Sequence, residues 1–375
     1  MTKNLTNYRR LFPITKKCAF LNHASVAPLS TRVRDAQRIL IDSRVSGTDM
    51  SEEREAGRAR VRRMCAQLVG GRPEEITLTR NTSHGINIVA NGVHWHAGDN
   101  LITADAEFPA NVYPWTNLRR KGVEVRFVSA RDHRILAEDI RELADERTRL
   151  VALSFVEFYS GYRNDMAAIG QFCDDRGLFF SVDGIQGLGA LDFDARATNV
   201  DFVSAGAAKW LMGPVGTGFF WCRREFIEHL DPAVAGWMGV VDEDDYFCYD
   251  SPLRSDARRF EEGSLNNLGI WGFEASLGLL LEVGIDRIEP RIMSLTDYLI
   301  EGLRKRGCPI LSPITSRKER SGIITFLPKS GGAGELHQRL TDAKVVVSQR
   351  GAGIRVSPHF YNTEEDLDRL LDELP

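Results

Sequence analysis

Residues 178–218 read LFFSVDGIQGLGALDFDARATNVDFVSAGAAKWLMGPVGTG and contain the two strand ends around which the fold is organised. The apolar run 178–182 predicts a buried strand that ends on Asp183. A second apolar pair, Phe202 and Val203, leads through a turn of small residues to Lys209. Ligands of open α/β sheets bind at the carboxyl ends of strands. The stretch therefore predicts an α/β fold with a carboxylate and an amine at one edge of its sheet.

Asp183 and Lys209 together suggest a particular chemistry. A lysine amine forms a Schiff base with an aldehyde, and pyridoxal phosphate is the aldehyde cofactor whose ring nitrogen also requires an acid. Gln186 lies in the same loop and is placed to reach the phenolic oxygen of such a ring. The alternative is that Asp183 caps a helix and Lys209 is a solvated surface charge. The apolar, glycine-rich setting of Lys209, which WLMGP follows, argues against a surface lysine.

Two segments, VDGIQGLG at 182–189 and AAKWLMGPVGTGFF at 207–220, resemble the class V aminotransferase family. This family includes cysteine desulfurases, kynureninase and isopenicillin N epimerase, which are fold-type-I enzymes dependent on pyridoxal phosphate. Family-like segments extend from about Phe20 to Leu371. The resemblance implies that Lys209 is the Schiff-base lysine, that Asp183 pairs with the pyridine nitrogen, and that Gln186 contacts the phenolic oxygen.

The resemblance also implies an architecture, the fold-type-I transferase fold. A large cofactor-binding domain, residues 15–260, is expected to hold a mostly parallel seven-stranded sheet flanked by helices. A small C-terminal α/β domain is expected to comprise residues 261–375 together with 1–14. A length of 375 residues suits two domains. The segment FEASLGLLLEVGIDRIEPRI, residues 273–292, predicts one long helix that bridges them.

Composition limits the class of protein. Hydrophobic residues make up 43% and charged residues 27% of the chain, as in ordinary soluble globular enzymes. A net charge of −4 gives no electrostatic footprint for nucleic acid, and no basic run indicates a membrane surface. The N-terminal segment has no apolar core of signal-peptide length, and no stretch approaches about 18 apolar residues. We expect a cytoplasmic protein that binds neither nucleic acid nor membrane.

Six cysteines are scattered along the chain without a Cys-x-x-Cys pair or histidines at zinc spacing. We therefore expect no metal site. A disulfide framework is not expected without export, so most of the cysteines are predicted to be small buried hydrophobic residues.

A phosphate site is predicted at TRNTSHGINIVANGV, residues 79–93, where a short strand leads into a helix. Free N–H groups and the positive end of the helix dipole favour an anion there, and Thr82 and Ser83 add hydroxyl donors. The alternative is simple N-capping by Asn81 or Thr82. The segment also resembles the family's phosphate loop, which implies that Thr82 and Ser83 bind the cofactor phosphate.

Phe108 follows the predicted strand at 101–103 and is placed to stack on the pyridine face. The alternative is that Phe108 belongs to the core. Desulfurases typically have a histidine at this position, and phenylalanine cannot transfer a proton. The loop 348–353 also lacks the cysteine on which desulfurases form their persulfide. A desulfurase that relays sulfur through a persulfide is therefore disfavoured.

Further departures from the desulfurase pattern occur near the expected cofactor. Gly206 stands where desulfurases often have a phosphate-binding serine, and Ala208 stands where the family usually has histidine or tyrosine. Two side-chain anchors are thus missing or replaced by backbone N–H groups. The pair Glu157-Phe158 stands where desulfurases usually have Ser-Asn, which implies a different pocket.

Arginines are the expected substrate ligands, because a guanidinium binds a carboxylate bidentately. The resemblance implies that Arg355 holds the substrate α-carboxylate, with Arg350 as second choice; a surface salt bridge is the alternative. Arg163 either holds a substrate acid or braces its loop. His23 either lines the substrate pocket or is structural.

Residues 259–266, RFEEGSLN, resemble a family motif through which one subunit reaches the cofactor phosphate of the other. The motif implies that Ser264 makes this contact and that the enzyme is a homodimer with a shared active site.

The sequence thus favours a homodimeric pyridoxal-phosphate enzyme that acts on an amino acid, with Lys209 as base or acid at Cα. Aminotransferase-like chemistry, or C–S and β-elimination lyase chemistry, ranks ahead of epimerisation and decarboxylation. A non-catalytic scaffold dimer is the alternative from another class. A cofactor-free lysine aldolase would leave Asp183 and the phosphate loop unexplained.

Overall fold

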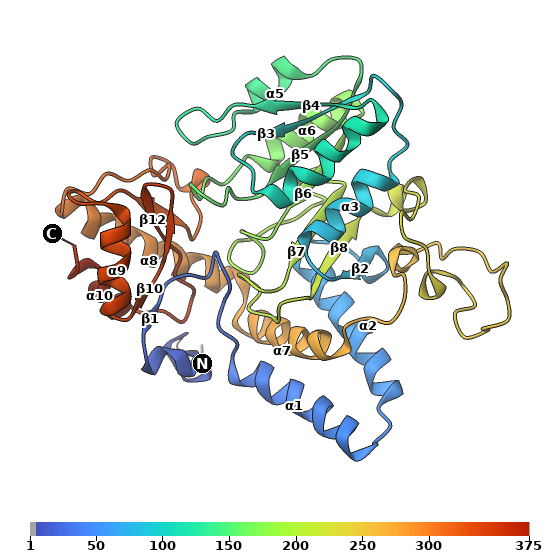
Figure 1. Ribbon diagram of the computed structural model, residues 1–375, viewed down its shortest axis with the longest axis horizontal. Helices are drawn as coiled ribbons and strands as arrows, with labels where there is room; N and C mark the ends of the chain where they lie inside the picture. Colours follow the sequence, from blue (N-terminus) through green and yellow to red (C-terminus); the bar gives the residue numbers. More distant parts are fainter. Residues whose placement is uncertain (1–4, 375) are drawn as a thin grey trace.

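The computed structural model describes residues 5–374. Its largest element is a seven-stranded sheet at the centre of the molecule (Figure 1). In spatial order the strands are β2 (Ile76–Thr79), β8 (Gly218–Cys222), β7 (Phe202–Gly206), β6 (Phe179–Asp183), β5 (Thr148–Ser154), β3 (Asn100–Ala104) and β4 (Glu124–Val128). Neighbouring strands from β7 to β4 are parallel, whereas β8 runs antiparallel to both β7 and β2. The expected mostly parallel seven-stranded sheet is confirmed.

The central strands are apolar on both faces because hydrophobic cores lie on both sides of the sheet. Successive side chains of β5 point to opposite faces. Val151 and Leu153 belong to one core, whereas Leu150 and Ala152 belong to the other. Every residue of β5 from Leu150 onward is buried as a result.

Helices flank the large sheet and form much of the smaller unit (Figure 1). They are α1 (Thr31–Ser46), α2 (Ser51–Leu68), α3 (Thr82–Gly92), α4 (Tyr113–Thr116), α5 (Ala137–Leu143), α6 (Met166–Arg176), α7 (Asn267–Val283), α8 (Ile285–Lys305), α9 (Ala333–Asp342) and α10 (Glu364–Leu371). Short 3₁₀ helices lie at Leu5–Leu11, Pro13–Lys16, Pro73–Glu75, Pro109–Asn111, Asn117–Lys121, Arg224–His229, Trp237–Gly239, Ala257–Phe260 and Arg317–Glu319.

The single long helix expected at 273–292 is wrong. Helix α7 ends at Val283 and α8 begins at Ile285, with a bend of 81° between them. Gly284 makes the break with φ of +89°, a backbone conformation that glycine adopts more readily than other residues. Helix α7 packs between α1 and α2, whereas the later turns of α8, from Leu295, enter the core of the smaller unit.

Among the described residues no single helix is long and apolar enough to cross a membrane, although the bent pair α7 and α8 together meets such a test by length and composition.

The smaller unit contains two small sheets. One has the order β11 (Ser348–Arg350), β12 (Gly353–Val356) and β9 (Ile324–Phe326), with both pairs antiparallel. In the other, β1 (Ala19–Phe20) from the start of the chain runs parallel to β10 (Val345–Val346). A segment near the start of the chain therefore lies beside one near its end (Figure 1). The domain limits 15–260 and 261–375 with 1–14 stay predictions.

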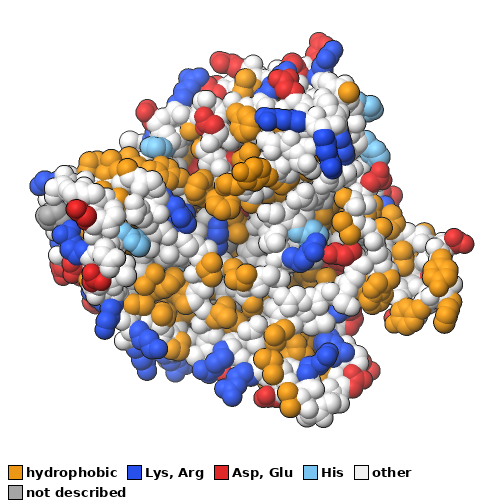
Figure 2. Space-filling view, in the orientation of Figure 1, with side chains coloured by type: hydrophobic (Ala, Val, Ile, Leu, Met, Phe, Trp, Pro, Cys, Tyr) orange, Lys and Arg blue, Asp and Glu red, His pale blue; other side chains and the backbone are white. Residues whose placement is uncertain are grey.

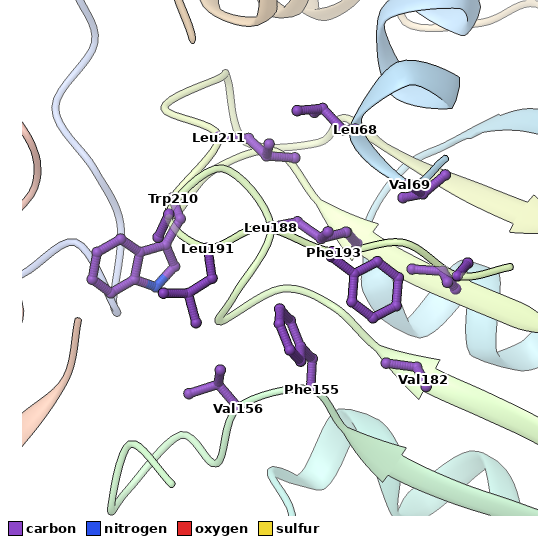
Figure 3. Close-up of a cluster of buried hydrophobic side chains, with 14 of the residues drawn as sticks. Leu68, Val69, Phe155, Val156, Val182, Leu188, Leu191, Phe193, Trp210 and Leu211 are labelled. Atoms are coloured by element: carbon purple, nitrogen blue, oxygen red, sulfur yellow. The ribbon is translucent and has the colours of Figure 1, made fainter. Parts of the chain in front are cut away.

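A buried apolar cluster holds the chain just beyond Lys209 (Figure 3). Trp210 and Leu211 lie there with Leu188, Leu191 and Phe155, all of them in the same core. Trp210 is also fixed through its carbonyl, which lies 3.0 Å from the Nε2 atom of His359. The backbone that carries Lys209 is thus fixed by burial of its neighbours.

A protruding arm, defined as residues 237–253, extends from the body of the molecule between β8 and α7 (Figure 1). It exposes the aromatic side chains of Trp237, Tyr246, Phe247 and Tyr249, and the space-filling view shows hydrophobic side chains gathered on it (Figure 2). Exposed apolar groups of this number mark an interaction surface more often than a free one.

Candidate active site

Asp183 and Lys209 lie at the carboxyl ends of neighbouring parallel strands. Asp183 is the last residue of β6, and it pairs in register with Ser204 of β7. Lys209 follows the end of β7 after a two-residue turn. The topology therefore brings the acid and the amine to the same edge of the sheet, as the sequence predicts.

Each of these two groups alters the pKa of the other. Burial raises the pKa of Asp183 to about 6, against the opposing effects of the Ile185 N–H and of Lys209. Burial also lowers the pKa of Lys209 to about 8, with Asp183 opposing the shift and Arg355 and Arg350 adding to it. Near neutral pH Lys209 therefore has an appreciable uncharged fraction, the form in which an amine is a nucleophile.

One carboxylate oxygen of Asp183 is available to accept a hydrogen bond from a ring nitrogen. Its Oδ1 accepts a hydrogen bond from the backbone N–H of Ile185 at 2.9 Å, and within residues 5–374 its Oδ2 accepts none. Only 2% of the residue is exposed, so its carboxylate is poorly solvated and gains from a further donor. A protonated pyridine nitrogen would supply the donor, so the residues present fit pyridoxal phosphate.

Gln186 is buried and held from two sides. Its Oε1 accepts from the indole Nε1 of Trp210 at 3.0 Å, and its Nε2 donates to the carbonyl of Ala24 at 3.1 Å. One N–H of the amide is left for another acceptor. The side chain is thus oriented by the Trp210 cluster and can donate one further hydrogen bond.

Thr82 and Ser83 begin helix α3, and Asn81 is its N-cap, with Oδ1 accepting from the His84 N–H at 2.9 Å. The N-capping alternative therefore holds for Asn81. Thr82 is buried, and its Oγ1 accepts from the Gly206 N–H at 2.9 Å. That bond joins α3 to the end of β7 and leaves the Thr82 proton free to donate.

The Gly206 N–H is not available to replace a serine anchor, because Thr82 already accepts it. Of the two alternatives for this anchor, replacement by the backbone N–H is therefore disfavoured at Gly206. Ser83 is half-buried and lines, with Phe108, a hollow of about 700 Å³. The N–H groups of Thr82 and Ser83 remain as anion donors beside that hollow, whereas that of His84 is taken by Asn81.

Phe108 is not a core residue, because 42% of its surface is exposed. The Nζ atom of Lys209 lies 5.3 Å from the centre of its ring, and the ring of Phe158 meets it edge-on at 5.2 Å. Phe108 therefore faces the space next to Lys209, where a planar ring could stack on it.

Arg355 is buried on β12, which contradicts the surface-salt-bridge alternative. Its Nη1 donates to the carbonyl of Phe158 at 2.6 Å and its Nη2 donates to Ser25 Oγ at 2.9 Å. Its Nε has no partner, and no carboxylate within residues 5–374 forms an ion pair with it. Burial, and after it the charge of Arg350, lowers the pKa of Arg355 to about 9, so the side chain stays charged at neutral pH.

For Arg163 and His23 the contacts favour the structural alternative over substrate binding. Arg163 forms an ion pair with Glu289 at 2.8 Å and donates to the Asp192 carbonyl, so it braces its loop. His23 is fully buried, with Nδ1 2.9 Å from the Ser357 carbonyl and Nε2 2.8 Å from the Tyr361 hydroxyl. Both of its ring nitrogens are engaged within the protein, so it has no atom left for a substrate.

Ser264 lies on the surface in the segment before α7. Just ahead of it, Glu261 is buried and accepts hydrogen bonds from Arg62 at 2.7 Å and from the Leu78 N–H at 3.0 Å. The motif is thus anchored at Glu261 and presents Ser264 outward. Its contact with a second subunit stays a prediction.

Two buried carboxyl groups were not predicted as site residues. Glu107 accepts from the N–H and the hydroxyl of Ser154 at 2.5 and 2.6 Å, and burial raises its pKa to about 7. Burial, then Glu107, raises the pKa of Glu157, whose Oε2 has no partner. In the sequence, Glu157 stood out only because desulfurases usually have Ser-Asn at positions 157 and 158. No local sequence pattern marked Glu107 as a site residue, because its partner, Ser154, is 47 residues away.

Within residues 5–374 no group of three His, Cys, Asp or Glu side chains is placed to hold a metal ion. All six cysteines are free thiols; Cys248 on the protruding arm is exposed, and the other five are buried.

Comparison with known proteins gives consistent results along nearly the whole chain. Residues 41–370 match the family described as Aminotransferase class-V. A probable cysteine desulfurase of Methanothermobacter thermautotrophicus is 30% identical, with 98% of this chain and 96% of the relative covered. An uncharacterized aminotransferase, YcbU, of Bacillus subtilis is 25% identical, with 98% and 96% covered.

Solved structures share the fold. The apo cysteine desulfurase of Thermococcus onnurineus superposes with a TM-score of 0.89 at 23% identity, covering 98% of this chain and 96% of that one. The cystine C–S lyase C-DES, solved with cysteine persulfide, gives a TM-score of 0.88 at 23% identity, covering 97% of this chain and 100% of that one. By its sequence match the chain belongs to the class-V aminotransferase family, and its fold is that of the cysteine desulfurases.

Proposed function

We propose that this enzyme is a pyridoxal-phosphate-dependent C–S lyase, which cleaves the bond between Cβ and sulfur in a sulfur-containing amino acid. The choice of bond is supported by the names of the relatives, cysteine desulfurase and cystine C–S lyase. The observation that carries the cofactor assignment is the pairing of buried Asp183, with its free Oδ2, and Lys209 at neighbouring strand ends.

Residues from separate segments would hold the cofactor. Asp183 would bind the ring nitrogen, Phe108 would cover one face of the ring, and Gln186 would donate its remaining N–H to the phenolic oxygen. Thr82 and Ser83, with the first N–H groups of α3, would bind the phosphate. When bound, pyridoxal phosphate draws electrons from the substrate Cα and so makes its proton removable.

Lys209 would act as the attachment point and then as the base that removes the Cα proton. Its pKa of about 8 suits both roles near neutral pH. Phe108 cannot exchange a proton, so we assign the proton transfer to Lys209. The Cβ–S bond then breaks with its electron pair on sulfur, the sulfur takes a proton and leaves as a thiol, and water releases the rest as ammonia and a keto acid.

The sulfur would leave without capture by a cysteine at the hairpin of β11 and β12. Residues 348–353, SQRGAG, contain no cysteine. Five of the six cysteines are buried, and the exposed one lies on the protruding arm. A lyase that releases its sulfur product fits these residues better than a persulfide relay.

The proposal is tested by reduction of the cofactor-loaded protein with borohydride. Before reduction we expect a yellow protein. After reduction the colour should be lost, and mass spectrometry should show the label at Lys209. Lys209→Ala should abolish the label and lower the turnover rate at least about 10³-fold, because it removes both the attachment point and the proton-transferring group. Lys318→Ala, which removes an exposed lysine, is the control and should change neither.

A protein that stays colourless with added pyridoxal phosphate, or that is labelled equally on many lysines, would contradict the assignment and favour a scaffold. Pyruvate, ammonia and thiol should appear in equal amounts from a cysteine conjugate. Formation of an amino acid from an added keto acid would instead indicate an aminotransferase.

A further inference from the structure

Arg350 and Arg355 lie on the same face of one hairpin. In the register of β11 and β12, Ser348 stands opposite Arg355 and Arg350 stands opposite Gly353. Side chains two residues apart along a strand share a face, and directly opposed residues share it too. The two guanidinium groups therefore project together, with Gly353 leaving the space opposite Arg350 without a side chain.

Both arginines converge on one hydroxyl. Ser25 Oγ accepts from Arg355 Nη2 at 2.9 Å and from Arg350 Nη2 at 3.5 Å. It also lies 2.9 Å from Ser348 Oγ, which donates to Asn22 Oδ1 at 2.8 Å. Guanidinium groups only donate hydrogen bonds, so Ser25 Oγ accepts from both arginines and donates its own hydrogen bond to Ser348 Oγ. The serines thus fix both arginines without neutralising either.

Neither guanidinium has an acidic partner. No carboxylate within residues 5–374 forms an ion pair with Arg350 or Arg355, and the buried Nε of each has no acceptor. Elsewhere in the chain the buried Arg62 is matched by Glu261 at 2.7 Å. Arg355 is buried, and Arg350 is half-buried with a buried Nε. Charged groups removed from water are normally paired, so two unpaired arginines side by side indicate missing negative charge.

The pair is linked to the reacting centre through Phe158. The carbonyl of Phe158 accepts from Arg355 at 2.6 Å, and its ring meets that of Phe108, whose centre is 5.3 Å from Lys209 Nζ. The charges of Arg355 and Arg350 both lower the pKa of Lys209, and Arg350 lowers that of Arg355. Asp183 is the acid that opposes them at Lys209, and it is committed to the ring nitrogen in the proposed function. The substrate α-carboxylate supplies one negative charge, which leaves one positive charge unmatched.

We propose that the substrate carries a second acidic group on its side chain, which Arg350 binds while Arg355 holds the α-carboxylate. This specificity rests on the proposed function, since it assumes a substrate at Lys209. In the C–S lyase reaction the second acid belongs to the group attached to sulfur, or to the sulfur itself.

Binding to the cofactor-loaded protein tests this without turnover. By calorimetry, succinate should bind about tenfold more tightly than butyrate, which has the same carbon count and one charge fewer. Arg350→Gln should abolish that preference and leave butyrate binding within about twofold, whereas Arg355→Gln should weaken both. Arg350→Lys, which keeps the charge, should retain part of the preference, and exposed Arg304→Gln is the control.

Turnover offers a matched pair of substrates. S-carboxymethyl-L-cysteine and its neutral amide, S-carbamoylmethyl-L-cysteine, differ in one charge. We expect kcat/KM about tenfold higher for the acid, and equal values in Arg350→Gln.

Equal affinity for succinate and butyrate in the unmutated protein would overturn the proposal and leave one carboxylate shared by both arginines. The proposal would also be overturned if inorganic phosphate displaced butyrate and this displacement were lost in Arg350→Gln. That result would indicate a site for inorganic anions. A protein that remains colourless with pyridoxal phosphate but still prefers succinate through Arg350 would overturn the proposed function and keep the dianion site.

Discussion

Asp183 is a carboxylate that water solvates poorly, because only 2% of the residue is exposed. Burial raises its pKa from 3.8 to about 6. The folded protein therefore binds this proton more tightly than the unfolded chain does. Below pH 3.8 the group is protonated in both states, and as pH rises from 3.8 to 6 the folded state loses stability relative to the unfolded one. Without its cofactor the protein thus loses stability through its own site residue.

Replacing this carboxylate should stabilise the cofactor-free protein. Asp183→Asn should raise the free energy of unfolding by up to about 3 kcal/mol at pH 7.5, which corresponds to a shift of about two pKa units. The gain should vanish near pH 4, where native Asp183 is protonated. Urea unfolding at both pH values measures it, with exposed Asp35→Asn as the control; an equal gain at both would contradict the burial account.

The sequence locates those candidate residues whose position follows from their own strand. Asp183, Gln186 and Lys209 lie at or just after strand ends, so a local apolar pattern locates them. It left the roles of His23 and Arg163 open, because their partners, Ser357 and Glu289, are 334 and 126 residues away. No local pattern indicates which distant carbonyl or carboxylate will engage a side chain.

The junction of α7 and α8 shows the same limit at the scale of an element. The pattern around Gly284 remains apolar and periodic, and a lone glycine inside such a pattern is compatible with a continuous helix. Tertiary packing decides the outcome, because α7 must lie between α1 and α2 while α8 enters the smaller unit. The break therefore lay outside what helix periodicity can predict.

Gly284 should be intolerant of a side chain. Its φ of +89° is strained for alanine, and a Cβ there would meet the carboxylate of Asp286. Gly284→Ala should lower the free energy of unfolding by about 1–3 kcal/mol. Gly278→Ala, in the interior of α7 with nothing within 4 Å of its Cβ position, should raise it by about 0.5–1 kcal/mol. Denaturant midpoints compare the two; a loss at both positions would point to a general effect of helix substitution.

At the scale of the whole molecule, we propose that two copies associate and share their sites. Ser264 lies on the surface, and the aromatic residues of the protruding arm are exposed in the single chain (Figure 2). Light scattering should therefore give twice the chain mass of 42.0 kDa. In the sequence, only the resemblance to the family motif indicated this association, because no pattern of apolar residues marked an interface.

Mixed dimers test whether Ser264 acts across the interface. Ser264→Ala should weaken pyridoxal phosphate binding about tenfold through loss of a hydrogen bond to a charged group, whereas Ser330→Ala, on another exposed loop, should not. A dimer of one Lys209→Ala chain and one Ser264→Ala chain should bind at native affinity at its intact Lys209, because that site receives the serine of its neighbour. Weak binding in this mixed dimer would show that Ser264 acts within its own chain.

The pairing of β1 with β10 has a consequence for biosynthesis. The strand at Ala19–Phe20 cannot pair until residues 345 and 346 have been synthesised. Likewise, Ser25 cannot orient Arg355 until the hairpin of β11 and β12 has been synthesised. During translation the large sheet can form on the ribosome, but the side of the pocket that we propose to bind carboxylate is assembled only when the final tenth of the chain emerges. If Arg355 binds the substrate as proposed, the nascent protein is unable to recognise it until synthesis is nearly complete.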